Sequence, residues 1–479
     1  MRFAIGLFLC AALGGALTTH AAETVNDITQ LNPIVVDQVV RPTRLEQIVQ
    51  LVAGHPGPIA IGGGRYSMGG QTATEQALQI DMRGFNRVLD FSKERKEITV
   101  QPGITWRAVQ DYIDPHDLSV SIMQSYANFT VGGALSVNAH GRYIGYGPLV
   151  SSVKSIKLVL ADGQVVDASP RHNSDLFYGA IGGYGGLGVI VQATLQLSDN
   201  VRLLRSVEEM PLGDYRPYFQ ARIQNNPKVI LHNAVLYPDQ YQTLRAVSYS
   251  QTDLPVTVKE RLTPLDQNYW KEQKALKVVS QWPGGKTLRQ EVIDPLVLKK
   301  PQVSWRNHEA SLDVRELEPD SRAKRTYVLQ EYFVPPDQLE SFVQEMGATL
   351  RAHKVNVINL SIRHAKADPG TLLAWAKTEV FALVLYYQQS TAPEEREKVG
   401  VWTRALVDSA IERGGSYYLP YQIHATAQQF RAAYPRAGEF LALKARVDPQ
   451  NKFRNKLWDA YGLGAVSYTH LTLPTNREV

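Results

Sequence analysis

Cysteine is nearly absent from this 479-residue sequence, which has a single cysteine at position 10. One cysteine cannot form an intramolecular disulfide, so packing must stabilise the fold even in an oxidising compartment. Cysteine-based zinc sites are excluded as well, and His308, His353, His364 and His424 show no metal-ligand spacing with one another. We therefore expect no metal site.

Two other patterns are also missing. No block of like charges is long enough to form a nucleic-acid-binding arm, and the formal net charge is only +5. The G-x-S-x-G elbow of serine hydrolases is absent. The sequence does contain 44% hydrophobic residues over a long chain. This composition predicts a globular protein of two or more domains, with no nucleic-acid partner.

The first 22 residues have the pattern of a secretory signal peptide. A basic start at Met1-Arg2 is followed by an apolar core at 3–17 and by small residues at 19–22. The apolar run is shorter than the roughly 20 residues needed to span a membrane. We expect export with cleavage, giving a periplasmic or secreted mature chain without an integral membrane span. An uncleaved membrane anchor is the alternative.

Glycine is concentrated in the segment 61–71, IGGGRYSMGGQ, which contains five glycines. Glycines let a backbone turn sharply and bring its N–H groups against an anion, where a Cβ would obstruct the approach. The segment has neither the G-K-[ST] of a P-loop nor the helix-opening G-x-G-x-x-G of a Rossmann fold. Taken alone, it is either an ordinary surface turn or a pyrophosphate-binding loop.

A second segment, 130–141 (TVGGALSVNAHG), favours the binding loop. Between and around these loops, runs rich in branched residues at 58–61, 78–82, 87–91 and 97–100 predict short strands. The order of these elements predicts an α+β fold rather than βαβ units.

Further elements follow along the chain. Asp162-Gly163 suits a type I′ turn, so 154–168 is predicted to be a hairpin, and the glycine-rich turn at 182–190 leads into a strand that ends at Leu197. The remaining predicted elements are strands within 201–236, 246–249, 325–334 and 355–362, a helix over 264–279, and a helix from a capping box at 391–394 to Gly414-Gly415, with Val399, Trp402, Leu406 and Ala410 on one face.

These segments resemble the vanillyl-alcohol oxidase superfamily, whose FAD domain is named after p-cresol methylhydroxylase (PCMH). Within it, the chain is most similar to the aldonolactone oxidases and the decaprenylphosphoryl ribose oxidases. The resemblance is carried by the blocks 62–70, 130–141, 154–168, 182–190 and 414–453.

The resemblance implies a two-lobed α+β fold. The FAD-binding PCMH-type domain would span 23–205, and a substrate (cap) domain with an antiparallel sheet flanked by helices would span 206–412. A closing segment, 413–462, would return to the flavin. Residues 466–479 follow the family's usual ending, and we interpret them as a non-native tail.

The resemblance also assigns residues to the cofactor. The flavin-binding candidates are Ile61, Gly62, Gly63, Gly64, Arg65, Tyr66, Ser67, Met68, Gly69, Gly70, Gln71, Ser125, Thr130, Val131, Gly132, Gly133, Ser136, Val137, Asn138, Ala139, His140, Gly141, Gly188, Val189, Ile190 and Tyr418. Many relatives attach the flavin through a histidine just before a serine of the first loop. Here Tyr66 precedes Ser67, and the mature chain has no cysteine, so we expect non-covalent FAD.

Four residues are the catalytic candidates. Tyr421 stands where relatives have a lysine near the flavin pyrimidine. Arg363 matches a basic strand position that could supply the missing cation. Glu331 matches a polar substrate contact, and His140 lies in the loop that wraps the flavin. Arg363 and Glu331 could equally be solvated strand charges, and His140 a structural histidine.

Three classes of function remain open. The first is an FAD-dependent oxidoreductase that oxidises a CH–OH group of a sugar, sugar lactone or polyol, with oxygen or a quinone as electron acceptor. The second is a flavoenzyme of the same fold that acts on an amine, as in cytokinin dehydrogenases, or on a phenol. The third is a flavin-binding protein without turnover, suggested by the loss of both the histidine and the lysine.

Overall fold

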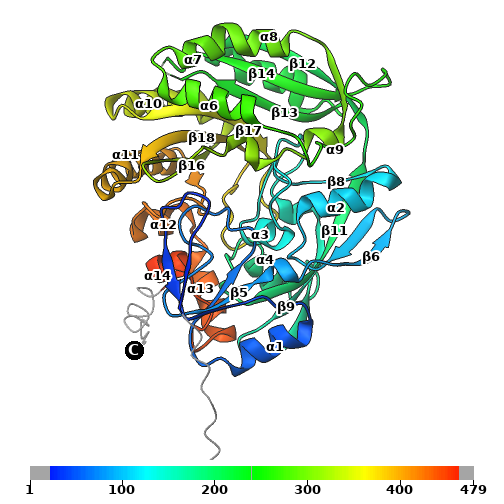
Figure 1. Ribbon diagram of the computed structural model, residues 1–479, viewed down its shortest axis with the longest axis vertical. Coiled ribbons are helices and arrows are strands. Elements are labelled where there is room, and N and C mark those ends of the chain that lie inside the picture. Colours follow the sequence, from blue (N-terminus) through cyan, green and yellow to red (C-terminus); the bar gives the residue numbers. More distant parts are fainter. Residues whose placement is uncertain (1–21, 239, 463–479) are drawn as a thin grey trace, which may run out of the picture.

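The computed structural model describes residues 22–238 and 240–462 (Figure 1). The predicted signal peptide, apart from Ala22, and the predicted tail at 466–479 lie outside the described residues. Within the described part, no helix is both long and apolar enough to cross a membrane. These residues form four β-sheets, of eight, six, three and two strands.

The largest sheet occupies the upper part of the molecule in Figure 1, and its neighbouring strands are all antiparallel. Branched and aromatic residues favour such strands, and successive side chains point to opposite faces. The strand order is β15 (Gln302–Trp305), β12 (Arg202–Pro211), β14 (Thr243–Gln251), β13 (Val229–Leu236), β17 (Asn356–Ala365), β18 (Val380–Ser390), β16 (Arg325–Val334) and β19 (Ser416–Tyr417).

Different helices cover the two faces of this sheet. One face carries α6 (Trp270–Gln281), α7 (Gly285–Leu288) and α8 (Asp294–Leu298), and the other carries α5 (Leu212–Phe219), α10 (Leu339–Ala352) and α11 (Pro393–Glu412). On β16, Tyr327 joins an apolar cluster with Leu276 of α6. Tyr332, on the opposite face, contacts Phe342 of α10, with ring centroids 5.7 Å apart. Odd-numbered residues of β16 therefore face α6.

The six-stranded sheet is antiparallel and lies lower in Figure 1. Its strands follow the order β10 (Val165–Ala168), β9 (Val153–Val159), β11 (Val189–Asp199), β7 (Glu97–Val100) and β6 (Val88–Ser92), and β8 (Leu118–Val120) also pairs with β11. Helices α2 (Trp106–Ile113), α3 (Val131–Ser136) and α4 (Ser174–Ala180) belong to the same region. Both glycine segments adjoin these elements.

The three-stranded sheet is parallel, in the order β3 (Gln38–Val40), β5 (Leu78–Asp81) and β4 (Ile59–Gly62). Helix α1 (Leu45–Gly54) connects β3 to β4, which lie on either side of β5. The expectation that this region has no βαβ unit is therefore wrong for β3–α1–β4. The sequence did not reveal β3, because this strand has only three residues. It also directly follows β2 (Ile34–Val36), which pairs with β1 (Glu23–Val25) in a different sheet.

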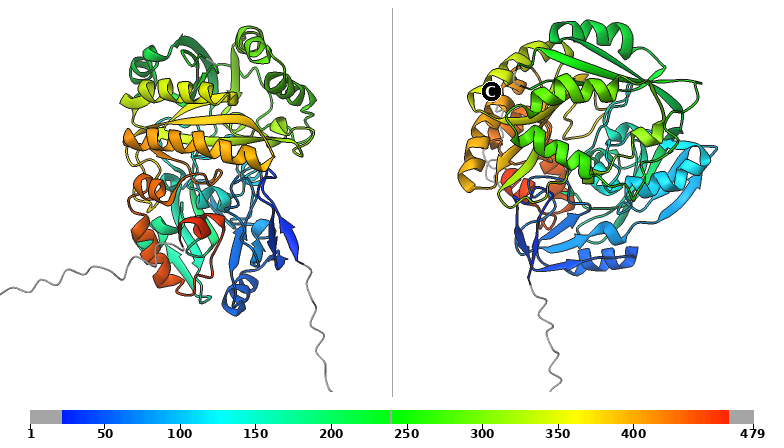
Figure 2. Two further views of the ribbon diagram at one scale, coloured as in Figure 1. Left: turned by 90° about the vertical axis from the view of Figure 1, so that its left-hand side faces the viewer. Right: turned by 45° about the horizontal axis from the view of Figure 1, so that its top comes forward.

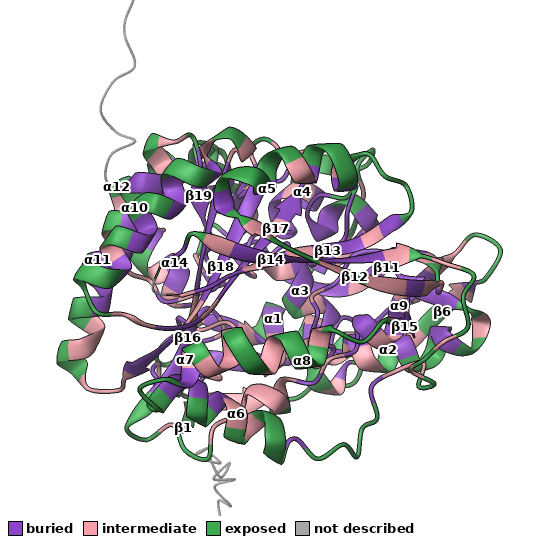
Figure 3. Cartoon of the chain, turned by 90° about the horizontal axis from the view of Figure 1, so that it is seen from above, coloured by how far each residue is buried: buried purple, intermediate pink, exposed green. Residues whose placement is uncertain are grey.

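The C-terminal segment lies in the same half of the molecule as the N-terminal strands (Figure 2, left). It contains α12 (Ala427–Ala433), α13 (Ala437–Val447) and α14 (Lys456–Tyr461). Phe453 forms a parallel bridge with Ile59, so the chain end extends the edge of the parallel sheet. Buried Lys444 donates to Asp448 at 2.7 Å and to the Gly186 carbonyl at 2.9 Å. Seen from above, buried residues dominate the strands and exposed residues the outer helices (Figure 3).

Several predicted elements differ from the observed ones. The hairpin β9–β10 is confirmed, but its turn is not type I′, because a five-residue connection at 160–164 joins the strands and Gly163 alone of the predicted pair has positive φ. Helix α5 interrupts the predicted strands of 201–236, and α6 begins at Trp270 rather than at Pro264. The buried face of α11 is confirmed, but its N-cap is Ala392, because the Thr391 hydroxyl donates to the Ala323 carbonyl instead.

Asp81, at the end of β5, is buried beneath the first glycine loop. Burial favours the neutral carboxyl, but hydrogen bonds from Arg83 and Arg41 outweigh this and lower the pKa of Asp81 to about 2. A carboxyl with a lowered folded-state pKa stabilises the fold above its unfolded pKa near 3.8, and this contribution is lost as pH falls towards 2. We expect Asp81→Asn to lower the free energy of unfolding by about 2 kcal/mol at pH 7.

This difference should shrink between about pH 4 and pH 2, which urea unfolding of both proteins at several pH values would measure. The exposed Asp253 offers the control, and Asp253→Asn should leave stability almost unchanged. An equal loss of stability at pH 2 and pH 7 would contradict the ionic role of Asp81.

Candidate active site

A cavity of about 700 Å³ lies between the eight-stranded sheet and the two glycine segments. Sheet residues of one face line it, as the period of two along a strand requires. These residues are Asn233 and Val235 of β13, Asn359, Ser361 and Arg363 of β17, Val384 and Tyr386 of β18, and Tyr327, Leu329 and Glu331 of β16, and Ile358 joins them at an irregularity in β17. The opposite wall includes Gly63, Gly64, Arg65, Tyr66, Ser67, Met68, Ser125, Thr130, Gly133, Val137, His140 and Tyr418.

A smaller cavity, of about 70 Å³, adjoins the first and shares Gly63, Ser67, Thr130, Gly133 and Val137 with it. Its remaining lining includes further flavin-binding candidates. These are Ile61, Gly62, Gln71, Gly132, Ser136, Gly188 and Ile190. The two cavities together follow the first glycine loop and the start of α3, and so offer an elongated site.

Close packing between the glycine segments explains two of the glycines. A Cβ on Gly63 would lie 2.3 Å from Oγ1 of Thr130, the residue that caps α3 by accepting from the Gly133 N–H. A Cβ on Gly69 would lie 2.4 Å from the carbonyl oxygen of Tyr421. Side chains at these positions would push the loops apart. Gly63 thus fits the expected cradle, whereas Gly69 serves contact with the closing segment.

The closing segment is tied directly to the first glycine loop. Gln71 Nε2 donates to the carbonyls of Leu419 and Tyr421, each at 2.7 Å. The Met68 N–H donates to the Pro420 carbonyl at 2.7 Å. These hydrogen bonds carry Tyr421 to the cavity, although 350 residues separate it from Gln71.

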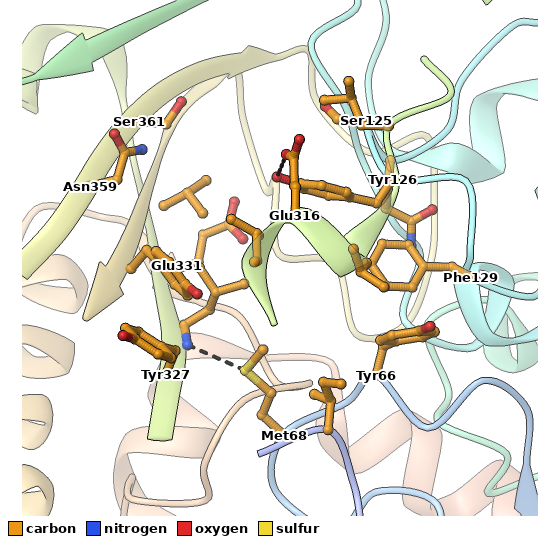
Figure 4. A pocket seen from close by; sticks show the side chains of 18 of the residues that line it. Tyr66, Met68, Ser125, Tyr126, Phe129, Glu316, Tyr327, Glu331, Asn359 and Ser361 are labelled. Carbon is orange, nitrogen blue, oxygen red and sulfur yellow. Dashed lines mark hydrogen bonds between the residues drawn. The ribbon is translucent and has the colours of Figure 1, made fainter. Parts of the chain in front are cut away.

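The four catalytic candidates lie together on the wall of the large cavity. The Tyr421 hydroxyl donates to Glu331 Oε2 at 3.1 Å, and His140 Nε2 lies 2.6 Å from Glu331 Oε1. Figure 4 shows Glu331 on its strand, with its side chain at the cavity. Glu331 is 2% exposed and His140 5% exposed. The structure thus centres the cluster on Glu331, whose carboxylate accepts a hydrogen bond from Tyr421.

Burial controls the electrostatics of this cluster. It raises the pKa of Tyr421 far above that of a free phenol, and the negative charge of Glu331 adds to the effect. Tyr421 is therefore a neutral hydrogen-bond donor. Burial lowers the pKa of Arg363 from its usual value, while Glu331 opposes the shift. Arg363 Nε and His140 Nδ1 have no hydrogen-bond partner among the described residues, as expected of a site that receives a ligand.

Aromatic rings fix the orientation of His140. Its ring centroid lies 4.9 Å from that of Trp375 and 5.8 Å from those of Phe333 and Tyr418. The Tyr418 hydroxyl donates to the Val137 carbonyl at 2.9 Å, which joins the closing segment to α3. This packing holds the imidazole against Glu331.

Some flavin-binding candidates lie outside both cavity linings. These are Gly69, Gly70, Val131, Asn138, Ala139, Gly141 and Val189. Asn138 instead donates to Asp368 at 2.8 Å and accepts from the Val150 N–H at 3.0 Å. Val131 and Val189 are fully buried. Val131 and Val189 therefore pack in the interior beside the glycine loops.

The sequence reasoning missed several residues that line the large cavity, among them Tyr126, Phe129, Arg142, Glu316, Asn359 and Ser361. Tyr126 and Phe129 directly precede the second glycine segment, which was an available signal. Alternation along 355–362 could have placed Asn359 and Ser361 on the face of Arg363. Glu316 had no signal, because it lies in a short 3₁₀ helix (Val314–Leu317) far from every motif.

Comparison with known proteins agrees with this geometry. Residues 33–169 match the family described as FAD binding domain. Relatives include L-gulonolactone oxidase of Mus musculus, 32% identical over 162 residues (34% of this chain, 37% of the relative). L-galactono-1,4-lactone dehydrogenase 2, mitochondrial, of Oryza sativa subsp. japonica is 33% identical over 132 residues (28% and 23%). Decaprenylphosphoryl-beta-D-ribose oxidase of Mycolicibacterium smegmatis is 32% identical over 147 residues (30% and 32%).

The chain therefore contains an FAD-binding domain of this family, and FAD is its cofactor. Its relatives are oxidases and dehydrogenases. The matched segments span about a quarter to about a third of the length of these relatives (37%, 23% and 32%).

The residues present fit FAD. The large cavity, about 700 Å³, has the size of a cofactor site. Arg65 lines it from the first glycine loop, and its Nε has no hydrogen-bond partner within the described residues. Gly62, Gly63 and Gly64 would hold the pyrophosphate portion, where backbone N–H groups can face an anion. The Glu331 cluster would then lie at the substrate.

Proposed function

We propose that this protein is an FAD-dependent oxidoreductase that oxidises a CH–OH group of a sugar, sugar lactone or polyol. The observation that carries the proposal is the cluster of Glu331, Tyr421, His140 and Arg363 in a cavity that also touches the first glycine loop. A buried carboxylate can accept the proton of a substrate hydroxyl. The names of the lactone oxidases and dehydrogenases among the relatives support this substrate class.

FAD, when bound, supplies the hydride acceptor. Glu331 Oε1, which has no hydrogen-bond partner among the described residues, receives the hydroxyl proton, whereas Oε2 accepts a hydrogen bond from Tyr421. His140 Nε2, 2.6 Å from Oε1, holds the carboxylate in place. The guanidinium of Arg363 offsets negative charge that develops at this end of the cavity.

The arrangement of the chain in this proposal has two lobes. Residues 23–205 hold the cofactor, residues 206–412 form the cap domain above it, and the closing segment 413–462 returns to the flavin. The position of the cavity between the eight-stranded sheet and the glycine segments supports this division. The pattern of the first 22 residues supports export to the periplasm or beyond the cell.

Anaerobic mixing of the yellow holoprotein with a panel of polyols, sugar lactones, amines and phenols tests the proposal. Bleaching of the flavin by a polyol or a lactone is the expected result. Bleaching by amines or phenols alone would favour the second class of function. A flavin that no donor bleaches would favour a binding protein without turnover. Reoxidation by air or by a quinone then identifies the class of acceptor.

We also expect the FAD to be non-covalent. Tyr66 lines the cavity and packs edge-on against Phe129, with ring centroids 4.6 Å apart, and the described residues include no cysteine. Tyr66 therefore lacks the histidine nitrogen that usually attaches the flavin at this position, and the described residues offer no cysteine sulfur. Acid precipitation should therefore release all of the yellow colour into the supernatant. Fluorescent flavin that stays with the denatured polypeptide on a gel would contradict this prediction.

A further inference from the structure

The large cavity has a second polar cluster that the proposed reaction does not use. The Tyr126 hydroxyl donates to Glu316 Oε1 at 2.8 Å. Figure 4 shows this pair across the cavity from Asn359 and Ser361, with Glu331 at a separate position. All of these residues line the same cavity. A ligand of sufficient length can therefore contact both clusters.

The pair is held in place before any ligand binds. Tyr126 and Glu316 lie on two segments that are hydrogen-bonded to each other around Asn128. Asn128 Oδ1 accepts from the Val314 N–H at 2.9 Å, and its Nδ2 donates to Asp313 at 3.2 Å. Fixed groups of this kind cost a ligand little ordering entropy.

Glu316 has unused hydrogen-bonding capacity. Across residues 22–238 and 240–462, no ion pair involves Glu316, and Tyr126 is the one side chain that donates to it. Burial raises the pKa of Glu316, and the negative charges of Glu272 and Asp313 add to this effect, while the hydrogen bond from Tyr126 and the positive charge of Arg142 oppose it. The site thus disfavours further negative charge. An ionised carboxylate accepts hydrogen bonds only, so a matching ligand group must be a donor.

The second cluster lies within electrostatic reach of the first. Burial raises the pKa of the Tyr126 hydroxyl far above its usual value, Glu316 raises it further, and the positive charge of Arg363 lowers it. Tyr126 therefore lies within electrostatic reach of both the carboxylate of Glu316 and the guanidinium of Arg363. Polar groups thus continue from Glu331 to Glu316 along the cavity.

We propose that Glu316, positioned by Tyr126, binds hydroxyl groups of the substrate remote from the carbon that is oxidised. The preferred substrates are then uncharged, polyhydroxylated molecules long enough to reach from Glu331 to Glu316. Sugar acids, whose remote carboxylate would face Glu316, are disfavoured. This inference rests on the proposed function and specifies the substrate class of the same site.

Glu316→Gln in the FAD-loaded protein tests the inference. The substrates are a series of linear polyols of three to six carbons, assayed with a dye acceptor. A hydrogen bond to a charged group contributes about 1.5–3 kcal/mol, so the variant should raise KM for the longest polyol by roughly tenfold or more. The effect should decrease with chain length, because short polyols do not reach Glu316. Inhibition by the six-carbon aldonic acid should strengthen in the variant.

Glu397→Gln, at an exposed position on α11, is the matched control and should change none of these values. Thermal melting and FAD content of each variant report on folding. Equal effects of Glu316→Gln on short and long polyols, or unchanged inhibition by the aldonic acid, would overturn the inference.

If no polyol or lactone bleaches the wild-type flavin, the proposed function fails separately. Titration of the flavin absorbance spectrum with the same polyols then measures Kd directly. A Kd that Glu316→Gln does not change would overturn the second site in that case as well. A Kd that the variant raises for long polyols alone would support the site without turnover.

Discussion

Glu331→Gln should slow anaerobic reduction of the flavin by roughly 10²- to 10⁴-fold, because glutamine has the shape of glutamate but cannot accept the hydroxyl proton. The carboxylate is central to the cluster, since both His140 and Tyr421 contact it. The NH₂ group of the glutamine side chain could also place a hydrogen-bond donor opposite the donating hydroxyl of Tyr421. Stopped-flow spectroscopy with a substrate that turns over measures the rate directly.

FAD content provides the first control for Glu331→Gln. Since Glu331 lies on β16 and is not one of the glycines that would hold the pyrophosphate, the variant should keep its flavin. Glu397→Gln gives the same chemical change at an exposed position and should reduce at the wild-type rate. Reduction of Glu331→Gln at the wild-type rate would show that the hydroxyl proton leaves by another route.

Tyr421→Phe should slow the same step by roughly 10²-fold, as removal of one stabilising donor does elsewhere. The phenol is neutral, because burial and Glu331 raise its pKa, so its contribution is a hydrogen bond and not a charge. Arg363→Ala should slow reduction at least as much, since it removes the cation that lines the same cavity as Glu331. Both variants should retain FAD.

Tyr417→Phe is the matched control for Tyr421→Phe. Tyr417 lies four positions earlier on the same closing segment, is buried, and lines neither cavity. Its variant should reduce at the wild-type rate. A similar loss in both tyrosine variants would indicate damage to the closing segment, and unchanged rates in Tyr421→Phe and Arg363→Ala would show that the cluster was assigned wrongly.

Local pattern predicted much of the fold. The strand predicted at 325–334 matches β16 residue for residue. It is buried on both faces rather than half-buried, because helices cover both sides of the sheet. The parallel sheet was missed, since β3 is three residues long and its partners come from distant segments. Helix α5 was also missed, because it interrupts a region of high strand propensity. Tertiary pairing decides such short elements, and one sequence does not reveal it.

The residues of the candidate site could be selected from the sequence, but their contacts with one another could not. Glu331, Arg363, His140 and Tyr421 were all selected from the sequence, and the structure brings them to one cavity. Their mutual contacts were not foreseen, because they depend on strand register and on the return of the chain end. The second cluster at Glu316 depends on a short 3₁₀ helix that no motif marks.

The hydrogen bonds between Gln71 and the carbonyls of Leu419 and Tyr421 join the first glycine loop to the closing segment. During synthesis, the first glycine loop is made long before the segment that completes it. Capture of FAD must therefore wait until the closing segment has been made, and the cofactor then holds this segment and the first glycine loop together. A C-terminally clipped sample should therefore lose its flavin while its β-sheets are still intact, because the closing segment no longer holds the first glycine loop.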